Sequence, residues 1–485
     1  MEHLALITIV LPFVGAFLVG LDKNAARFPK TATLFAALAT LGTLLLAQQW
    51  YASGQSSVSY DVVKFGNTVI FGITLDAVST LIGFAVVALG FLIILYSNGY
   101  LTEKNREHSH PPLPRFYAFL LVFVGAMAGL VLSSTLVGQL LFFEITGACS
   151  WALISYYQTP KAQAAAMKAL IITHVGSLGL YIAAAYLFSQ TGTFSVTALE
   201  QTDPTTKTIV LFGVMFAAWG KSAQLPLQIW LPNAMEAPTP VSAYLHAASM
   251  VKVGVYIFAR AVMSAGDIPH IVGEVGLVMA MITLIYGFLM YLPQTDLKRL
   301  LAYSTITQLS YIFIGLSLFA LGSKLAFVAA IAYIFNHAFA KSLFFLVAGS
   351  LAYATGTRLM PRLRGIMRTM PLVGAGFGVA ALAIAGVPPF NGFFSKFPLF
   401  AAGFALGREQ MWITVLMVIA LIESTATFVW LLYKFGQCVP GKPSEEVARA
   451  QPLPFSMSVV LIILMVMSVC SGFIAAYWLD TPWLG

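Results

Sequence analysis

Charged residues and cysteines are both scarce in this sequence. Asp, Glu, Lys and Arg make up 9% of its 485 residues, whereas a soluble domain carries about 25%. The three cysteines share no close spacing, so no disulfide framework, zinc site or iron–sulfur motif is indicated. No predicted helix carries two spaced histidines for haem. These shortages exclude a soluble globular domain, and no cofactor or metal is expected.

Apolar residues are abundant, since 59% of the chain is hydrophobic, which also excludes a disordered chain. About 20 such residues cross a membrane as one helix. The stretches that satisfy this requirement are 3–21, 31–52, 74–99, 115–135, 136–157, 165–190, 207–229, 241–264, 269–293, 300–320, 325–354, 372–403, 411–434 and 456–478. They predict an all-α polytopic membrane protein with fourteen transmembrane helices in one membrane domain, residues 1–485. The first stretch lacks a basic segment and a cleavage site, so it is expected to be retained rather than removed as a signal peptide.

The basic residues predict an orientation in the membrane. Of the 26 Lys and Arg residues, 17 fall in loops on one side, 4 fall in loops on the side of the N-terminus, and 5 fall inside spans. Cytoplasmic loops carry the excess of Lys and Arg, so both termini are expected outside a bacterial inner membrane. The net charge of +8 then follows from topology, and a nucleic-acid partner is excluded.

Several ionisable residues lie well inside the predicted spans, where each central charge costs about 2.5–3.5 kcal/mol. They are Glu144, His174, Lys221, His246, Lys252, His337, Lys341, Lys396 and Glu423. Such groups must be paired, hydrated or neutral, and each is a candidate for function. Plainer explanations stay open for His246 as a core histidine, for Lys252 as a lysine that extends to the membrane surface, and for Glu423, which has no visible partner. Arg260 lies near the outer end of its span, and its side chain is expected to extend to the surface.

Regular spacing places some polar residues on common helix faces. Lys221, Gln224 and Gln228 share roughly one face of a helix, which indicates a hydrated line. His337 and Lys341 stand four residues apart and share one face of an apolar helix. Both patterns favour a polar interior over an accidental buried charge.

Prolines interrupt two of the predicted spans. The seventh holds Pro226 and ends at Pro232, and the twelfth holds Pro388-Pro389. Interrupted helices in corresponding positions of two halves point to a transport site, because freed carbonyl groups can hold water or ions. A simple packing kink is the alternative, but each break lies beside a lysine, Lys221 or Lys396.

Lysine and histidine suit proton movement through such an interior. A free lysine titrates near pKa ~10.4; desolvation lowers that pKa, and a nearby carboxylate raises it. A lysine with a movable carboxylate partner is therefore a switchable proton carrier, and histidine can serve as an intermediate station. The residues indicate proton or cation movement and do not identify the energy source.

One long stretch of the sequence resembles a known family. It comprises Gly220–Pro226, Trp230–Pro232, Glu236–Ala243 and His246–Ala248. The stretch resembles the proton-translocating, antiporter-like subunits of respiratory complex I, which are similar to the large subunits of Mrp-type sodium/proton antiporters. The resemblance is closer still to component D of hydrogenase 4, in the membrane arm of a formate hydrogenlyase-type complex. The stretches that carry it are Gly99–His108, Phe142–Tyr157, Met250–Gly254, Asn336–Leu346, Pro388–Phe400 and Val439–Glu445.

The resemblance implies two inverted five-helix repeats, helices four to eight (115–264) and nine to thirteen (269–434), with broken helices 7 and 12. It implies a proton-translocation path in which Lys221 is the partner of Glu144. The path residues are Glu144, Lys221, His246, Lys252, His337, Lys341 and Lys396, with His174, Glu236 and Glu423 as possible members. In the sixth helix an Arg-Val-Gly-Asp run of the family reads His174–Ser177, so its acid is missing. His246 and Lys252 are six residues apart, so they join one path only if the helix is distorted or water bridges them.

These observations lead to one main hypothesis and three alternatives. The main hypothesis is a proton-translocating subunit of a hydrogenase-4 or formate hydrogenlyase-type complex. Its partners are other membrane subunits and a peripheral nickel–iron hydrogenase arm, and the chain itself holds no redox centre. The alternatives are an Mrp-like Na⁺/H⁺ antiporter subunit, a complex I-type NADH:quinone oxidoreductase subunit, and a structural anchor whose buried charges merely pair.

Overall fold

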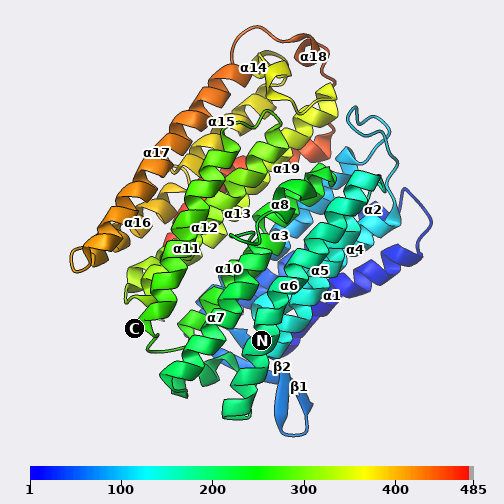
Figure 1. Cartoon of the computed structure of the whole chain (residues 1–485). Coiled ribbons are helices and arrows are strands. Elements are labelled where there is room, and N and C mark those ends of the chain that lie inside the picture. The colour runs from blue at the N-terminus through cyan, green and yellow to red at the C-terminus, as the bar shows by residue number, and fades with distance from the viewer. Residues whose placement is uncertain (480–485) are drawn as a thin grey trace.

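Long helices packed side by side form almost the whole of the computed structural model, which describes residues 1–479 (Figure 1). The longer helices are α1 (Glu2–Leu21), α2 (Phe28–Ala52), α3 (Ala77–Tyr100), α4 (Pro114–Leu132), α5 (Leu136–Ile154), α6 (Pro160–Thr191), α7 (Pro204–Lys221), α9 (Thr239–Ala247), α10 (Met250–Met263), α11 (His270–Tyr291), α12 (Leu297–Ala320), α13 (Lys324–Thr355), α15 (Pro371–Ala385), α16 (Phe393–Gly407), α17 (Met411–Cys438) and α19 (Phe455–Leu479). One-turn helices are α8 (Trp230–Asn233), α14 (Ile366–Thr369) and α18 (Glu445–Ala448), and the 3-10 turns are η1 (Val196–Gln201), η2 (Ala234–Glu236) and η3 (Met360–Arg362).

The helices confirm the predicted polytopic membrane fold. Within residues 1–479, twelve helical segments are long and apolar enough to cross a membrane, with Thr239–Met263 counted as one. The two remaining predicted spans correspond to α7 and to the shorter pair α15 and α16. The chain is therefore a polytopic integral membrane protein, and each predicted apolar stretch coincides with a helix or a pair of helices.

A β-hairpin that the sequence analysis missed projects from one end of the bundle (Figure 1). Strands β1 (Val58–Phe65) and β2 (Thr68–Leu75) pair antiparallel around a turn at Gly66, whose φ is +60°. The span predicted to begin at residue 74 therefore begins later, at α3, because Thr74 and Leu75 belong to β2. The Thr135 hydroxyl donates to the Ile70 carbonyl at 2.6 Å and ties the hairpin to the start of α5.

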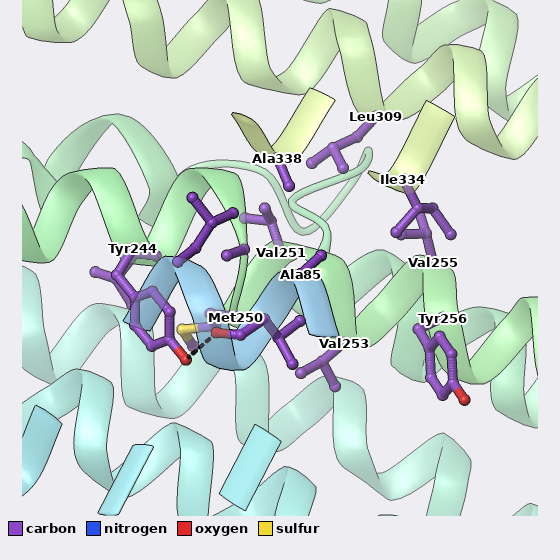
Figure 2. Packing of buried hydrophobic residues seen from close by; sticks show 14 of the residues in the cluster. Ala85, Tyr244, Met250, Val251, Val253, Val255, Tyr256, Leu309, Ile334 and Ala338 are labelled. Atoms are coloured by element: carbon purple, nitrogen blue, oxygen red, sulfur yellow. Dashed lines mark hydrogen bonds between the residues drawn. The ribbon is translucent and has the colours of Figure 1, made fainter. Parts of the chain in front are cut away.

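The centre of the bundle is formed by α12 and α13, whose most apolar stretches are wholly buried, whereas the corresponding part of α2 is only 33% buried. Figure 2 shows how α9 and α10 pack in this centre, with Tyr244 and Val251 near Ala85 of α3 and Ala338 of α13. The Tyr244 hydroxyl donates to the Val86 carbonyl at 3.0 Å. The peripheral helices expose apolar side chains on the outside of the bundle, as expected where lipid is the solvent.

Within the described part of the chain, three helices are interrupted near the middle of the bundle. The chain leaves α7 after Lys221 and becomes helical again only at α8. A second interruption separates α9 from α10 at Ala248 and Ser249, and a third separates α15 from α16. The predicted breaks in helices 7 and 12 are confirmed, and the break between α9 and α10 is an additional one.

Small residues bring α6 and α7 into close contact. A Cβ atom added to Gly176 would lie 2.9 Å from Cα of Gly220, and one added to Gly179 would lie 2.3 Å from the carbonyl oxygen of Gly213. Both approaches are closer than a side chain tolerates, so only glycine permits this packing. The contact fixes the end of α7, and with it Lys221, against α6.

Candidate functional site

Lys221 is the last residue of α7 and is buried, with 1% of its surface exposed. Its ammonium group donates to the Phe143 carbonyl at 3.0 Å and to the Thr146 hydroxyl at 3.1 Å, and it lies 4.5 Å from the centre of the Phe143 ring. These partners all belong to α5, so the interrupted end of one helix contacts the middle of another. The expected hydrated face of Lys221, Gln224 and Gln228 on one helix is wrong, because the helix ends at Lys221.

Glu144 is not the ion-pair partner of Lys221 in this structure. One of its carboxylate oxygens lies 3.1 Å from Nδ1 of His174 in α6, and its other oxygen, Oε1, is buried without a hydrogen-bond partner in the described residues. The Glu144 side chain is 30% exposed and the His174 side chain is 56% exposed. The sequence analysis named both residues but did not predict their contact, because pairing between two helices leaves no spacing signal.

Lys252 and His337 connect the two halves of the chain. Nζ of Lys252 in α10 lies 2.9 Å from Nδ1 of His337 in α13, and the two residues are 1% and 4% exposed. Lys252 therefore does not extend to the membrane surface, and that plainer explanation is wrong. A lysine and an imidazole at hydrogen-bond distance can exchange a proton directly.

Lys341 and His246 lie near this pair with different surroundings. Nζ of Lys341 donates to the Ser304 hydroxyl of α12 at 2.9 Å. His246 is fully buried against the ring of Phe345, at 4.8 Å between ring centres, and neither of its ring nitrogens has a partner in residues 1–479. The distortion that would let His246 and Lys252 share one path is present, because the helix breaks between α9 and α10.

The buried residues Lys221, Lys252, Lys341 and Lys396, with His246 and His337, are referred to as the lysine row. Lys396 lies at the end of this row opposite Lys221, and Glu423 lies near it. Nζ of Lys396 donates to the Ser424 hydroxyl at 3.0 Å and to the Ala385 carbonyl at 3.4 Å, which the end of α15 leaves free. Glu423 accepts hydrogen bonds from the hydroxyls of Tyr311 and Thr427, each at 2.5 Å. Glu423 thus has the buried partners that the sequence did not reveal, and it shares the Tyr311 ring with Lys396, whose Nζ lies 4.9 Å from the ring centre.

Arg260 corrects one expectation from the sequence. Its guanidinium does not extend to the membrane surface but pairs with the Asp76 carboxylate, and each side chain is 7% exposed. Asp76 is also the N-cap of α3, where it accepts the backbone N–H of Ser79 at 2.8 Å. The pair joins α3 to α10 and has a structural role apart from the lysine row.

A second charged cluster, at the opposite end of the bundle from the hairpin, was not predicted. The Arg358 guanidinium lies 3.2 Å from both Glu107 and Asp296. Lys298 is 1% exposed and donates to the carbonyls of Met235 and Ala237 at 3.0 and 2.7 Å. Those carbonyls flank Glu236, so this candidate residue belongs to the cluster and not to the central row. The basic residues of this cluster, Lys298 and Arg358, lie at helix ends. The sequence analysis used them only to predict the orientation of the chain in the membrane.

The buried lysines share one chemical property. Lys221, Lys252, Lys341 and Lys396 hydrogen-bond to carbonyls, hydroxyls or an imidazole, and in residues 1–479 none has a carboxylate oxygen within 4.0 Å. A buried ammonium without a counterion is expensive. Each group is therefore favoured to release its proton to a neighbour or to attract an approaching anion. In the same residues no group of three His, Cys, Asp or Glu side chains is placed to hold a metal ion.

Several known proteins are similar in sequence to this chain. A family model described as "NADH:quinone oxidoreductase/Mrp antiporter, TM" matches residues 133–422. A Na(+)/H(+) antiporter subunit from Alkalihalophilus pseudofirmus is 36% identical over 444 residues, which cover 85% of this chain and 54% of that protein. A Na(+)/H(+) antiporter subunit from Staphylococcus aureus is 36% identical over 424 residues, which cover 81% of this chain and 52% of that protein. The chain thus spans about half the length of the curated relatives it matches.

Two solved structures have a closely similar fold. A chain of the Mrp complex from a Dietzia species matches with a TM-score of 0.86 and 29% identity, over 98% of this chain and 51% of that chain. A chain of the membrane-bound sulfane sulfur reductase, an archaeal respiratory membrane complex, matches with a TM-score of 0.83 and 23% identity, over 98% of this chain and 95% of that chain. The second likeness shows the fold alone. In both, the shared part is the whole helical bundle described above.

Proposed function

Because the chain belongs to the NADH:quinone oxidoreductase/Mrp antiporter transmembrane family, we propose that it is a proton-translocating membrane subunit of an Mrp-type Na⁺/H⁺ antiporter complex. The relatives at 36% identity are named Na(+)/H(+) antiporter subunits. Their names favour this function over that of a hydrogenase subunit. The proposed partners are other membrane subunits, since the similar chains of known structure belong to membrane complexes.

The observation that carries the proposal is the contact between Lys252 and His337 at 2.9 Å. It joins α10 to α13 inside a buried region that contains three further lysines, none of which has a carboxylate partner in residues 1–479. A structural anchor would pair its buried charges with opposite charges, as Arg260 and Asp76 do. The lysine row lacks that pairing, and a row of proton carriers does not need it.

The proposed proton path follows the residues of the row. Protons would move through Glu144, Lys221, His246, Lys252, His337, Lys341 and Lys396. His174 and Glu423 would tune its two ends through their contacts with Glu144 and with Tyr311. We further propose that residues 115–264 and 269–434 are inverted repeats, each with one interrupted helix, and that both termini face outside a bacterial inner membrane.

A transport assay with matched variants tests the proposal. Lys221→Ala and Glu144→Ala would be expressed with the other subunits of the complex, in cells that lack their own sodium/proton antiporters. In everted vesicles, Na⁺-induced proton release should fall on the order of tenfold or more in each variant, which corresponds to at least 1.36 kcal/mol. The matched control is Lys168→Ala, at the exposed face of α6. Full exchange by both variants, with normal assembly, would defeat the proposal.

A subunit of a hydrogenase-4-type complex is the second candidate. It is favoured by the resemblance of the Met250–Gly254 and Val439–Glu445 stretches to component D of hydrogenase 4. Purification of the native complex separates the candidates. Co-purification with a nickel–iron large subunit would support the second candidate, quinone-linked NADH oxidation would support a complex I-type subunit, and small antiporter subunits would support the first.

A further inference from the structure

A partly exposed face of α3 lies between α2 and α19. Of the 24 residues of α3, all of which the structure describes, only Phe84, Phe91, Leu95 and Asn98 are not buried. Their spacing places them on one face of the helix, which is about 21 Å long at ~1.5 Å per residue. Among the helices that pack against α3, α2 and α19 are the least buried. The four residues therefore form the floor of a lateral groove, the α3 groove, whose walls are α2 and α19.

Aromatic residues close this groove at the end that carries the β-hairpin. The hydroxyls of Tyr51 in α2 and Tyr477 in α19 lie 2.9 Å apart. The ring centres of Trp50 and Trp478 in the same two helices are 5.5 Å apart. The two walls thus meet at this end, and the polar end of any long ligand in the groove must lie at the opposite end.

A cavity of about 630 Å³ lies at that opposite end. It is bounded by the end of α3 and by the first turns of α2, α4 and α19. Asn98 belongs both to the floor of the groove and to the lining of this cavity. The groove and the cavity are therefore continuous, with an apolar stem and a polar head, which we call the headgroup cavity.

The helix ends around the headgroup cavity favour an anion. The first turn of a helix presents free N–H groups and a partial positive charge, and three such turns converge here, at Pro29, Tyr117 and Ser456. Neither α2 nor α4 has a side-chain cap. Lys104 lies in the lining beside the exposed Glu103, and Lys30 follows Pro29 at the exposed start of α2. Phosphate groups bind where such N–H groups and cations meet.

Three polar atoms in the lining have no partner within residues 1–479. They are the hydroxyl of the fully buried Tyr117, the hydroxyl of Thr102 and Oδ1 of Asn98. The amide nitrogen of Asn98 donates to the Thr33 hydroxyl at 2.9 Å, which fixes this side chain. Buried polar groups are almost always satisfied by a partner. Two hydroxyls can donate to phosphate oxygens, and the amide oxygen can accept from a hydroxyl group, so the set fits a phosphate ester that also carries a hydroxyl.

We propose that the α3 groove and the headgroup cavity together bind one phospholipid with an anionic, hydroxyl-bearing headgroup, of the phosphatidylglycerol class. Its phosphate accepts hydrogen bonds from Tyr117 and Thr102 near Lys104, and its headgroup hydroxyl donates to Asn98. One acyl chain lies along the apolar floor of the groove. This inference does not depend on the proposed function, because the site is separate from the lysine row.

Binding of defined lipids to the purified full chain tests the chemistry of the ligand. Native mass spectrometry would follow titrations with palmitoyl-oleoyl phosphatidylglycerol, with the matching phosphatidylcholine, and with glycerol phosphate, which has no acyl chain. Phosphatidylglycerol should bind at least about fivefold more tightly than phosphatidylcholine. Glycerol phosphate should bind more than about 100-fold more weakly, because it buries no apolar surface. Equal affinities for the two lipids, or binding of glycerol phosphate as tight as that of phosphatidylglycerol, would overturn the proposal.

A conservative variant locates the headgroup. Tyr117→Phe removes one hydroxyl and keeps the ring, and the affinity for phosphatidylglycerol should fall about tenfold. Tyr156→Phe is the matched control, because the Tyr156 hydroxyl is also buried without a partner in residues 1–479 but Tyr156 is not in the lining. It should change the affinity less than about twofold. Equal affinities of the two variants would place the headgroup elsewhere and overturn the proposal.

A charge variant with exposed side chains avoids any effect on folding. Lys30→Gln combined with Lys104→Gln should weaken phosphatidylglycerol binding about tenfold or more. The control combines Lys161→Gln with Lys168→Gln, two exposed lysines of α6 away from the cavity. Equal weakening by both pairs would mean that binding follows net charge alone, and would overturn the proposed site.

A cryo-EM map in phosphatidylglycerol nanodiscs gives the structural readout. Elongated density should lie along the α3 groove and end in the headgroup cavity near the Tyr117 hydroxyl, and it should be absent in Tyr117→Phe with both lysines replaced. A helix of another subunit in the groove, or an empty groove, would overturn the inference. Loss of Na⁺/H⁺ exchange plays no part in these outcomes, so failure of the proposed function is distinguished from failure of this site.

Discussion

Nζ of Lys252 and Nδ1 of His337 lie 2.9 Å apart although 85 residues separate them in the sequence. The contact is possible because α9 and α10 are separate helices, so the chain turns at Ser249 before Lys252 approaches α13. Lys252 has no other side-chain hydrogen bond among the described residues. In the proposed path, the imidazole is therefore its direct partner for proton exchange.

Removal of the Lys252 ammonium tests this contact. Lys252→Met keeps most of the length of the side chain and removes its charge, so packing of α10 should persist while the exchange partner of His337 is lost. Proton movement in vesicles should fall by about tenfold or more. Lys252→Arg is the informative companion, because a guanidinium stays protonated and should fail equally in transport. Recovery of transport by Arg would mean that charge alone matters at this position.

The buried pair of Arg260 and Asp76 should stabilise the protein. Arg260→Met leaves the Asp76 carboxylate buried without its partner, which should lower the free energy of unfolding by about 3–5 kcal/mol. The exposed pair of Arg27 and Asp22 is the control, since its arginine is 71% exposed and Arg27→Met should change stability by less than about 1 kcal/mol. Denaturation of the purified protein followed by tryptophan fluorescence measures both. Similar stability of the two variants would contradict the structural role given to the pair.

The close packing of α6 on α7 predicts that even one added methyl group at this contact lowers stability and transport. Gly179→Ala adds a Cβ only 2.3 Å from the Gly213 carbonyl, so the helices must separate and displace Lys221. We expect the free energy of unfolding to fall by about 1–3 kcal/mol and proton transport to decrease. Gly20→Ala, whose added Cβ meets nothing within 4 Å, should leave both unchanged. Thermal denaturation and the vesicle assay give the two readouts.

Asp203, the N-cap of α7, predicts a local pH dependence. Hydrogen bonds from the Thr206 hydroxyl and from the N–H groups of Thr206 and Thr205 hold the pKa of its carboxylate below the usual value. The stabilisation is therefore present above the pKa of the unfolded chain, about 3.9, and is lost as the pH falls through the lower folded-state pKa. Hydrogen exchange at the start of α7 should accelerate below about pH 4 beyond the intrinsic change. Asp203→Asn should remove this extra acceleration, and its persistence would assign the effect to another group.

The sequence predicts most of the fold because lipid imposes a simple length requirement. Long apolar runs such as that of α3 directly predict transmembrane helices, and the prolines at 226 and 388 mark two interrupted helices. The hairpin of β1 and β2 was missed because its residues alternate along a short connection and form no long apolar run. The break between α9 and α10 was missed because no proline lies at Ala248 or Ser249.

The candidate residues were found because ionisable groups in apolar runs are conspicuous. The sequence did not reveal which groups these residues contact. Glu144 contacts His174, and Lys221 contacts carbonyl and hydroxyl groups of α5. Such contacts depend on how helices rotate and approach each other, which one sequence does not specify.

Helix α13 runs without interruption from Lys324 to Thr355, and its most apolar part is wholly buried. It carries His337 and Lys341, so two residues of the proposed path share one continuous helix. A change of charge at either residue therefore acts on a helix that has no break between them. Flexibility is then expected from the interrupted helices that pack against it, α9, α15 and α16. The division between a stiff centre and pliable flanks defines where motion during transport should be sought.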